Sequence, residues 1–280
     1  MLFEAFTYLR TPCAPAFRKM GYGRELIALQ ARAKRCAAAW QPHLQRTRSM
    51  IEGVAEGAGP KGQAVVLGSG ILADIPIEVL SQRFERVELV DLCHLPQTRA
   101  RAKAFGNVTL RTADVNGLAD ALVAWVAKGA APDALPSPQP MIGDILGAAD
   151  LVVSANLLCQ LPLLPLDYIQ DKAPRVAEDA LRTLAREIVE RHIRLLSQAP
   201  GRICLISEVE RLKGQGPEMS AAQSTLWDAA VTLPTDGVCD EEWLWDIAPA
   251  PVGSRSAPVQ NRVRGLIAPD GQTLARRCLI

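Results

Sequence analysis

The chain has 280 residues, enough for one large α/β domain with additions or for two small ones. Hydrophobic residues make up 49% and charged residues 22%, which excludes global disorder, and a net charge of +1 argues against a general electrostatic binder of nucleic acids. Seven scattered cysteines, an odd count without a CxxC pair, fit neither a zinc site nor a closed disulfide framework.

No stretch predicts secretion or membrane insertion. The N-terminal sequence carries Glu4 early and lacks a basic leader followed by an apolar core. The longest uncharged run, residues 151–166, is too short to span a bilayer and is interrupted by Asn156, Gln160 and two prolines. We therefore expect a cytoplasmic protein that makes no membrane contact.

The first sixty residues predict an N-terminal helical extension. Residues 1–20 are expected to be irregular because they contain two prolines. Apolar residues recur at helical spacing over residues 24–40, and Pro42 should separate this helix from a second one over residues 43–57. Basic side chains crowd both helices, which indicates either a solvated face or a cap that helps select a second substrate: Arg24, Arg32, Lys34, Arg35, Arg46 and Arg48.

Residues 63–91 have the order of a βαβ unit. A short apolar run at 64–67, bounded by glycines, predicts a strand buried on both faces. Gly68 and Gly70 then allow a sharp turn and a close approach of the backbone to a ligand. A second strand ends at Asp91, about twenty residues after the glycines, where a carboxylate accepts hydrogen bonds from both ribose hydroxyls of a nucleoside.

The helix between these two strands has its own start signals. Asp74 is expected to cap a helix whose first residues are Ile75 and Pro76, since proline at a helix start loses no hydrogen bond. This places a longer loop between the glycines and the helix.

Residues 97–154 predict two more strand–helix steps. A helix over residues 97–105 precedes a third strand that ends near Asp114, and Asp114 fits two roles: a partner for an adenine amino group, or a cap for the following helix. Residues 128–140 are rich in Ala and Pro and predict a loop. The fourth strand, residues 151–154, leads to a polar exit at Ser154 and Asn156.

The last third predicts a long helix over residues 173–198, opened by Pro174, and a fifth strand that ends at Glu208. A helix is expected over residues 219–231. Two final strands, residues 241–248 and 262–268, are joined by a proline-containing loop without a helix. Trp243 and Trp245 alternate along the first of them and share one face, either in the core or at a pocket mouth.

Strands that alternate with helices, followed by two strands without a helix between them, predict an α/β fold with a doubly wound, mostly parallel seven-stranded sheet that ends in an antiparallel pair. With the motif order above, residues 63 to about 267 resemble the class I S-adenosylmethionine-dependent methyltransferases, which are Rossmann-like. The resemblance implies S-adenosyl-L-methionine as cofactor. It divides the chain into an extension or cap at residues 1–60 and a methyltransferase domain at residues 61–280.

In that family a glycine loop holds the methionine part of the cofactor, an acid after the second strand holds the ribose, and an acid after the third strand contacts adenine. A polar residue after the fourth strand commonly faces the methyl group or the substrate. The residues here that match these places are Gly68, Ser69, Gly70, Asp91, Leu92, Asp114, Val115, Ser154 and Asn156. The sequence departs from the family at Val66, where many members have an acid, and at Leu72, where a third glycine would lie.

Two other functions fit the glycine loop. Residues 68–73 also match GxGxxG/A with Asp91 at the distance that an NAD(P)-dependent oxidoreductase needs. Pro76 favours the methyltransferase, because the dinucleotide fold begins its helix near the second glycine and would place this proline in an interior turn. A non-catalytic nucleoside-binding protein that keeps the fold is the third candidate, because methyl transfer depends mainly on alignment and leaves no obligatory catalytic signature.

Asn156 and Glu208 are predicted as the catalytic residues, with His94 as another candidate base; Glu208 and His94 also fit an ordinary strand-end acid and a loop residue. Cys93 and Cys159 are not expected to be nucleophiles, because adjacency to a histidine in sequence does not create a dyad. No metal ligands are predicted. The methyl acceptor is not identified, and the near-neutral charge favours a small molecule or a protein over nucleic acid.

Overall fold

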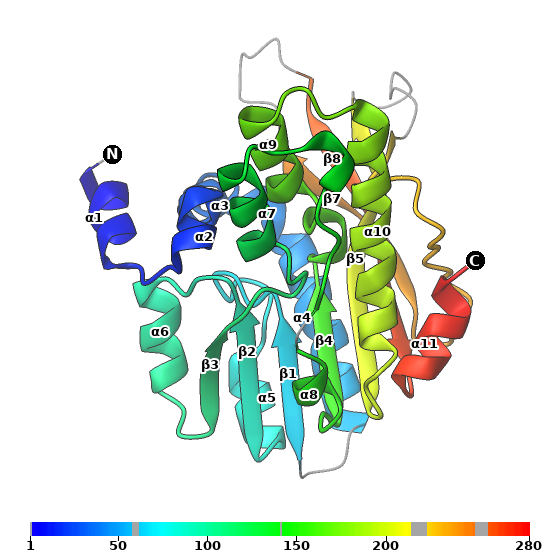
Figure 1. The fold of residues 1–280 in the computed structure, drawn as a ribbon. Coiled ribbons are helices and arrows are strands. Elements are labelled where there is room, and N and C mark those ends of the chain that lie inside the picture. The colour runs from blue at the N-terminus through cyan, green and yellow to red at the C-terminus, as the bar shows by residue number, and fades with distance from the viewer. Residues whose placement is uncertain (1, 58–61, 141, 214–222, 250–256) are drawn as a thin grey trace.

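The computed structural model describes residues 2–57, 62–140, 142–213, 223–249 and 257–280. One mixed β-sheet forms its centre, with helices on both faces (Figure 1). The strands are β1 (Gln63–Leu67), β2 (Arg86–Asp91), β3 (Val108–Thr112), β4 (Leu151–Ala155), β5 (Arg202–Lys213), β6 (Gln223–Ser224), β7 (Glu241–Ala248) and β8 (Val259–Ala268).

The sheet order is β3–β2–β1–β4–β5–β8–β7, with the short strand β6 paired to β5 off this path. Strands β1 to β5 are parallel, while β8 lies antiparallel between β5 and β7. The strand order reverses between β1 and β4, and a crevice opens at such a point in doubly wound sheets. The predicted fold class, a mostly parallel Rossmann-like sheet that ends in an antiparallel pair, is confirmed.

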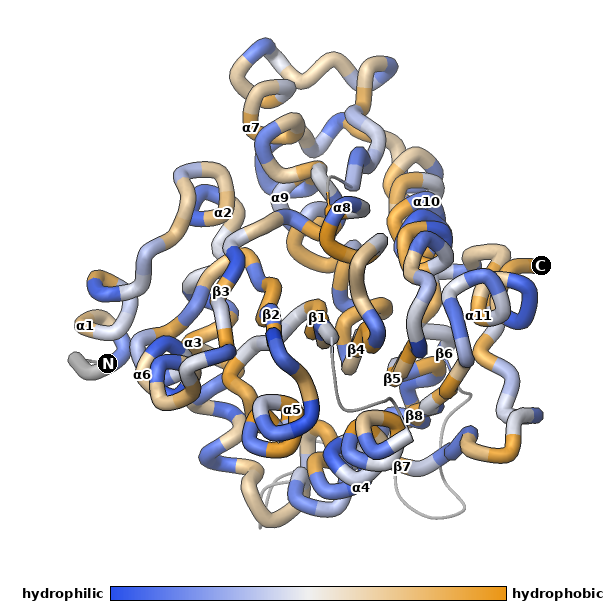
Figure 2. The backbone as a smooth tube through the Cα atoms, turned by 90° about the horizontal axis from the view of Figure 1, so that it is seen from below, coloured by the Kyte–Doolittle hydropathy of each residue, from blue (hydrophilic) through white to orange (hydrophobic). Residues whose placement is uncertain are grey.

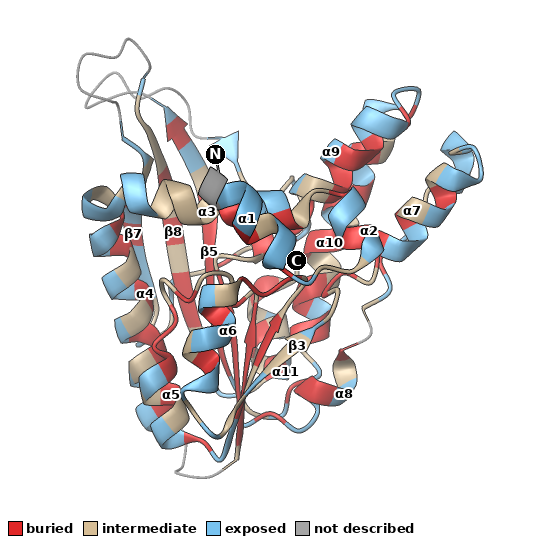
Figure 3. Cartoon of the chain, turned by 90° about the vertical axis from the view of Figure 1, so that its left-hand side faces the viewer, coloured by how far each residue is buried: buried red, intermediate tan, exposed pale blue. Residues whose placement is uncertain are grey.

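Each face of the sheet packs against its own set of helices (Figure 2). One face carries α4 (Ala37–Gly57), α5 (Ile77–Arg83) and α6 (Pro96–Lys103). The other carries α7 (Ala119–Ala127), α8 (Gly143–Leu146), α10 (Glu178–Leu196) and α11 (Gly271–Cys278). Side chains of β1 alternate between the two apolar clusters, because successive residues of a strand point to opposite faces, and the strand is buried throughout as predicted. Figure 3 shows buried residues along the strands in the centre of the molecule and exposed residues on the outer faces of the helices.

The N-terminal residues form three further helices, α1 (Leu2–Arg10), α2 (Pro15–Lys19) and α3 (Tyr22–Arg35). The expected irregular start is therefore wrong, because Pro15 opens α2 at the first helical position, where a proline loses no hydrogen bond. The expected break at Pro42 is also wrong. Pro42 lies inside α4, and the chain turns at Cys36 instead. Burial of Trp40 and His43 against the sheet outweighs the local preference of the proline.

Part of the predicted extension contributes to the core of the sheet. Ile51 and Val54 of α4 are fully or almost fully buried in the same cluster as Val66 of β1. The division of the chain at residue 60 stays a prediction.

Three other local expectations differ from the structure. The long helix α10 begins at Glu178, and an additional helix, α9 (Leu163–Lys172), precedes it. Short helical turns η1 (Pro132–Ala134) and η2 (Leu158–Gln160) also occur. The helix expected over residues 219–231 is wrong within its described part, 223–231, where Trp227 and Asp228 have positive φ angles that no α-helix permits. Residues 219–222 lie outside the described ranges, as does much of the loop between the last two strands. Within those ranges no helix is both long and apolar enough to cross a bilayer.

Candidate functional site

A cavity of about 570 Å³ lies at the edge of the sheet where β1, β2 and β4 end. Loops that follow the first four strands form its floor, residues of β5 and β7 form one side, and helices α3 and α4 cover it. Its volume falls within the range usual for small-molecule sites, about 300–1,000 Å³. The cavity lies at the point where the strand order reverses, as expected for a ligand site in this kind of sheet.

The glycine loop begins the floor of this cavity. Gly68 has φ +73° and Gly70 has φ +52°, conformations that residues with a Cβ rarely adopt. The Gly68 N–H donates to the carbonyl of Val90 across 2.9 Å, which ties the loop to β2. A Cβ on Gly68 would lie 2.9 Å from the side chain of Leu157. Glycine is therefore required here by both backbone conformation and space.

The rest of the loop runs to the start of α5 at Ile77. Pro76 precedes the first helical residue, so the prediction that this proline sits harmlessly at the helix start is confirmed. Asp74 does not cap the helix, contrary to expectation, because its carboxylate turns into the cavity and accepts a hydrogen bond from Asn156. Leu72 has φ +57° and is fully buried, so a leucine holds a strained backbone position that favours glycine.

Asp91 ends β2 beside this loop. Its Oδ2 accepts the Gly70 N–H across 2.7 Å, and its Oδ1 accepts the Leu92 N–H at the same distance. Burial raises the pKa of this carboxyl, and these hydrogen bonds oppose the rise. A carboxylate has about four acceptor positions, so oxygens that serve two backbone donors retain capacity for hydroxyl groups of a ligand.

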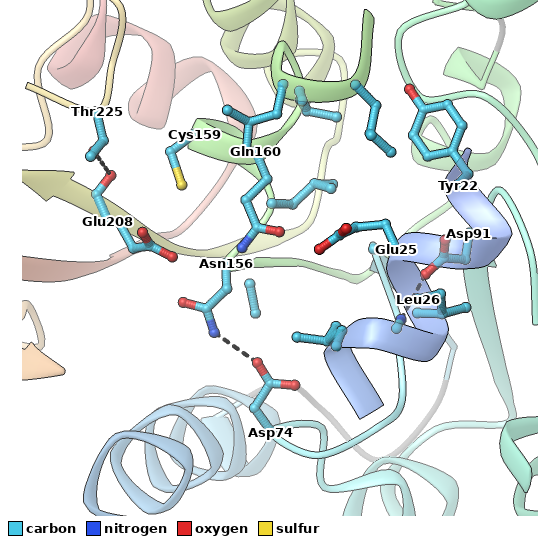
Figure 4. A pocket seen from close by; sticks show the side chains of 18 of the residues that line it. Tyr22, Glu25, Leu26, Asp74, Asp91, Asn156, Cys159, Gln160, Glu208 and Thr225 are labelled. Atoms are coloured by element: carbon cyan, nitrogen blue, oxygen red, sulfur yellow. Dashed lines mark hydrogen bonds between the residues drawn. The ribbon is translucent and has the colours of Figure 1, made fainter. Parts of the chain in front are cut away.

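Asp114 follows β3 and caps α7. Its carboxylate accepts the backbone N–H groups of Asn116, Leu118 and Ala119 at 2.8–2.9 Å. The capping role is thus present, and Asp114 also lines the cavity. Burial and the charges of Asp114 and Asp91 raise the pKa of the phenol of Tyr22 in α3. Figure 4 shows Tyr22 on the same side of the cavity as Asp91.

Asn156 follows β4 with φ +54°. Its Nδ2 donates to Oδ2 of Asp74 across 2.7 Å and lies 3.2 Å from Nε2 of His43. The His43 ring stacks on Trp245 with centroids 4.0 Å apart and an interplanar angle of 7°. Burial lowers the pKa of His43 to about 3 and raises the pKa of Asp74. The buried carboxyl of Asp74 therefore holds the amide of Asn156 at the cavity wall, beside the neutral imidazole of His43.

Glu208 lies in β5 and is only 2% exposed. Asn261 of β8 donates from Nδ2 to Oε2 of Glu208, whereas Oε1 has no hydrogen-bond partner among the described residues. Burial raises the pKa of Glu208 to about 7, against the opposing charge of Arg211. The register of β5 against β8 shifts between Glu208 and Glu210. Such a bulge shifts by one residue the alternation of side chains between the two faces of the sheet, so that Glu208 and Arg211 both line the cavity.

The structure brings most of the predicted site residues to this cavity and leaves two away from it. The residues that line it are Gly68, Gly70, Asp91, Leu92, Asp114, Val115, Asn156 and Glu208. Ser69 is buried beneath the loop. Ser154 points to the opposite side, where its hydroxyl lies 2.9 Å from Nε2 of His192 in α10. Neither serine lines the cavity.

The other candidates for acid–base or nucleophilic chemistry are also placed. His94 is buried, with Nε2 3.1 Å from the carbonyl of Arg111, and it does not line the cavity. Cys93 and Cys159 do line it, but burial raises the pKa of both thiols, which leaves them protonated and weak as nucleophiles. In the described part of the chain, no cluster of His, Cys, Asp or Glu is arranged to hold a metal ion.

Several lining residues were not expected from the sequence. They are Tyr22 and Glu25 of α3, His43 of α4, Asp74, and Trp227, whose indole N–H donates to the carbonyl of Cys159 across 3.2 Å. Of the basic residues in the N-terminal helices, Arg32 lines the cavity and pairs with Glu25 across 3.4 Å. These contacts join segments far apart in the chain. Asp74 left no local signal either, because its position before Pro76 predicted a helix cap.

The sequence matches no family model, and comparison with curated proteins finds no significant match. Solved structures similar to the chain include a complex of DhpI with S-adenosylhomocysteine (13% identity, TM-score 0.33, 85% of this chain and 93% of that one). Another is the Burkholderia thailandensis 1,6-didemethyltoxoflavin-N1-methyltransferase with 1,6-didemethyltoxoflavin and S-adenosylhomocysteine bound (14%, 0.36, 85% and 88%). A third is the magnesium protoporphyrin IX methyltransferase of Synechocystis PCC 6803 with bound S-adenosylmethionine (14%, 0.33, 79% and 79%). With TM-scores below 0.5, we draw no functional conclusion from these similarities.

Proposed function

We propose that the chain is an S-adenosylmethionine-dependent methyltransferase whose reaction takes place in the cavity at the ends of the parallel strands. The observation that carries this proposal is the convergence of four elements on one cavity: the glycine loop, Asp91 after β2, Asp114 after β3 and Asn156 after β4. Along the sheet they lie in the order Asp114, Asp91, glycine loop, Asn156, which is the order in which the family's motifs would hold adenine, ribose, methionine and the reacting methyl group.

The residues present fit this cofactor. Gly68 has no room for a Cβ beside Leu157, so only glycine lets the loop keep this course, and Asp91 keeps acceptor capacity beside the loop that it anchors. On this proposal Gly68 and Gly70 flank the methionine part, Asp91 and Leu92 hold the ribose, and Asp114 and Val115 contact adenine. Bound there, the cofactor supplies a methyl group activated by a sulfonium.

The chain's own residues would align the acceptor and remove its proton. Asn156 is fixed by Asp74, which suits it to orient a polar group of the acceptor. Glu208 has a free oxygen and a pKa of about 7, which suits a proton acceptor at neutral pH. The cover formed by α3 and α4 would exclude water.

The glycine loop favours the methyl donor over NAD(P). In the dinucleotide fold the helix begins at the glycines and its N-terminus binds the pyrophosphate. Here α5 begins at Ile77, well beyond Gly70, and its first residue follows a proline. A non-catalytic nucleoside-binding protein would not need the buried, partly unpaired Glu208 at the far side of the cavity.

We further propose that the acceptor is a small molecule or a protein rather than nucleic acid, which is supported by the carboxylates that line the cavity. A cytoplasmic setting is proposed because the seven cysteines are unpaired.

Calorimetric titration tests the proposed function. S-adenosylmethionine and S-adenosylhomocysteine should bind the purified protein and NAD should not. Asp91→Ala should abolish binding, and Asp91→Asn should weaken it at least about tenfold, because an amide accepts fewer hydroxyl hydrogen bonds than a carboxylate. Glu85→Ala, at an exposed acid outside the cavity, is the control. Binding of NAD alone would overturn the proposal.

A further inference from the structure

The interior of the cavity is lined by acids and lacks a matching set of bases. Four carboxyl groups are buried or half-buried there: Asp74, Asp91, Asp114 and Glu208. Among the described lining residues there is no lysine; of the two arginines, Arg32 is paired to Glu25, and Arg211 is exposed, with its charge opposing the raised pKa of Glu208. The low polarity of such a site strengthens attraction to a positive charge and disfavours an anion.

Of the four acids, Glu208 is the one that the proposed cofactor site and the hydrogen bond of Asp74 to Asn156 do not explain. It is 2% exposed, and the side-chain amides of Asn261 and Gln160 are hydrogen-bond partners of its carboxyl group, while Oε1 has no partner of full hydrogen-bond geometry among the described residues. Figure 4 shows its carboxyl group turned toward the side of the cavity where Asn156 and Gln160 lie. A buried carboxyl oxygen without a hydrogen bond costs free energy unless a ligand supplies the donor.

The place of Glu208 in the sheet separates it from the proposed cofactor residues. Asp91 ends β2, and β1 and β4 lie between β2 and β5. Three spacings of about 4.8 Å put the two strands roughly 14 Å apart at this edge. Asn156 follows β4 and lies between the two acids (Figure 4). Glu208 therefore faces the acceptor end of the cavity.

Aromatic rings form part of the same wall. Trp227 is held at the cavity by its hydrogen bond to the backbone carbonyl of Cys159, a residue drawn next to Glu208 in Figure 4. Trp245 is held by stacking on His43. Faces of aromatic rings attract cations, and combined with a buried carboxylate they form a usual recognition site for organic ammonium groups.

We infer that the methyl acceptor is a small amine, positively charged in water, whose nitrogen binds Glu208. This inference rests on the proposed function and names its substrate class. Glu208, as the carboxylate, takes one proton from the ammonium group and becomes the neutral acid. The nitrogen lone pair then forms a bond to the methyl carbon of the sulfonium donor. The carbon–sulfur bond breaks with its electron pair on sulfur, which gives the neutral thioether and the methylated ammonium product.

Matched ligands test the amine assignment. Protein saturated with S-adenosylhomocysteine is titrated at pH 7.5 with tryptamine, phenethylamine and spermidine, and with indole-3-propionate and 3-phenylpropionate as anionic counterparts of the first two. At least one amine should bind about tenfold or more tightly than either carboxylate, as expected for a charge-assisted hydrogen bond. Glu208→Gln should lose this preference, and Glu210→Gln, a control on the same strand whose carboxylate pairs with Arg262, should keep it.

The outcomes separate the inference from the function on which it rests. If S-adenosylhomocysteine binds and no amine exceeds the carboxylates in the wild-type protein, the amine assignment is overturned and the proposed function stands. If S-adenosylhomocysteine does not bind, both fail. Transfer of labelled methyl from S-adenosylmethionine to a bound amine would support the inference directly, and the wild-type titrations decide it even if Glu208→Gln does not fold.

Discussion

Nε1 of Trp243, in β7, donates a hydrogen bond to Nδ1 of His43, in α4, across 3.0 Å. An indole nitrogen only donates, so Nδ1 must be the unprotonated nitrogen of the ring. The neutral imidazole therefore carries its proton on Nε2, which lies 3.2 Å from Nδ2 of Asn156 but makes no hydrogen bond to it, because both nitrogens are donors. Two residues 200 positions apart thus fix the tautomer of a side chain at the cavity wall.

The tautomer of His43 can be observed directly. Long-range 1H–15N NMR should find its proton on Nε2 at pH 8 and still at pH 5, because burial lowers the pKa of His43 to about 3. Trp243→Phe removes the donor to Nδ1 and should give a mixture of tautomers. Trp40→Phe is the control, because the Trp40 indole donates to the carbonyl of Ile247 instead. A wild-type His43 that titrates near its ordinary pKa would contradict the prediction.

His192 should make the protein sensitive to acid. Burial lowers its pKa to about 4 from an ordinary 6.5, so between these values the unfolded chain binds a proton that the folded chain does not. Stability from this group is present above pH 6.5 and is lost as the pH falls toward 4. Between pH 7.5 and 5 the loss is about 2 kcal/mol.

Urea unfolding of wild-type protein and His192→Gln at both pH values measures this loss. Glutamine retains a hydrogen bond to Ser154, the partner of His192. The variant should lose about 2 kcal/mol less than the wild type on acidification. An equal pH response in the two proteins would mean that His192 titrates normally in the folded state.

Glu208 should have the opposite effect on stability. Burial raises its pKa from 4.5 to about 7, so the folded chain holds a proton that the unfolded chain releases. Its favourable contribution is present below pH 4.5 and is lost as the pH rises through 7. Relative to wild type, Glu208→Gln should gain about 2.5 kcal/mol of unfolding free energy between pH 5 and pH 8. Chemical denaturation of both proteins at these two pH values measures the change. If the unfolding free energies of the variant and the wild type differ by the same amount at both pH values, the pKa of Glu208 is not raised.

Local sequence patterns predicted the sheet well because its strands are short apolar runs between residues that break regular structure. β7 begins and ends as predicted, and β2 ends at Asp91. The residues that form the floor of the cavity could be predicted as well, because parallel strands bring the residues after their ends to one edge of the sheet. A helical cap was one of two alternatives for the N-terminal helices, but the residues by which it reaches the cavity could not be predicted, since the positions of Tyr22 and His43 depend on packing between distant segments.

The directions of side chains near the strand ends were harder to predict. Ser154 and Asn156 are two residues apart and would share a face in a regular strand, yet only Asn156 lines the cavity. The positive φ of Asn156 ends the alternation. The bulge after Glu208 has the same consequence in β5, where it brings Arg211 to the wall. Neither irregularity has a signature in local composition.

Gly68→Ala should reduce both stability and cofactor affinity. The substitution imposes a Cβ on a backbone with positive φ, which costs about 1–2 kcal/mol, and it adds the overlap with Leu157. Gly129→Ala is the matched control, because Gly129 also has positive φ but open space around its Cβ position. The difference between the two variants in unfolding free energy isolates the overlap. Calorimetry should find weaker S-adenosylhomocysteine binding in Gly68→Ala only; equal binding by both variants would contradict a role of the loop in holding the ligand.

The position of the N-terminal segment against the site can be tested through two cysteines. Cys13, between α1 and α2, forms an antiparallel bridge with Cys93, two residues after Asp91. Cα atoms in such pairs lie about 4.5–5.5 Å apart, within the range of about 4.4–6.8 Å that a disulfide requires. Both thiols are free, and burial raises the pKa of Cys93, so the bond should form slowly and only with an added oxidant.

Oxidation with diamide followed by non-reducing peptide mass spectrometry should therefore give a Cys13–Cys93 crosslink, and Cys93→Ala should eliminate it. Cys239, which is exposed, should react with a maleimide at once but should not join the crosslink. Because the bridge holds the segment that leads into α3 beside Asp91, the crosslinked protein should keep its cover over the cavity and retain binding of S-adenosylhomocysteine. Crosslinks of Cys13 to other cysteines would mean that the N-terminal helices pack elsewhere, and Tyr22 and Glu25 would then lose their place at the site.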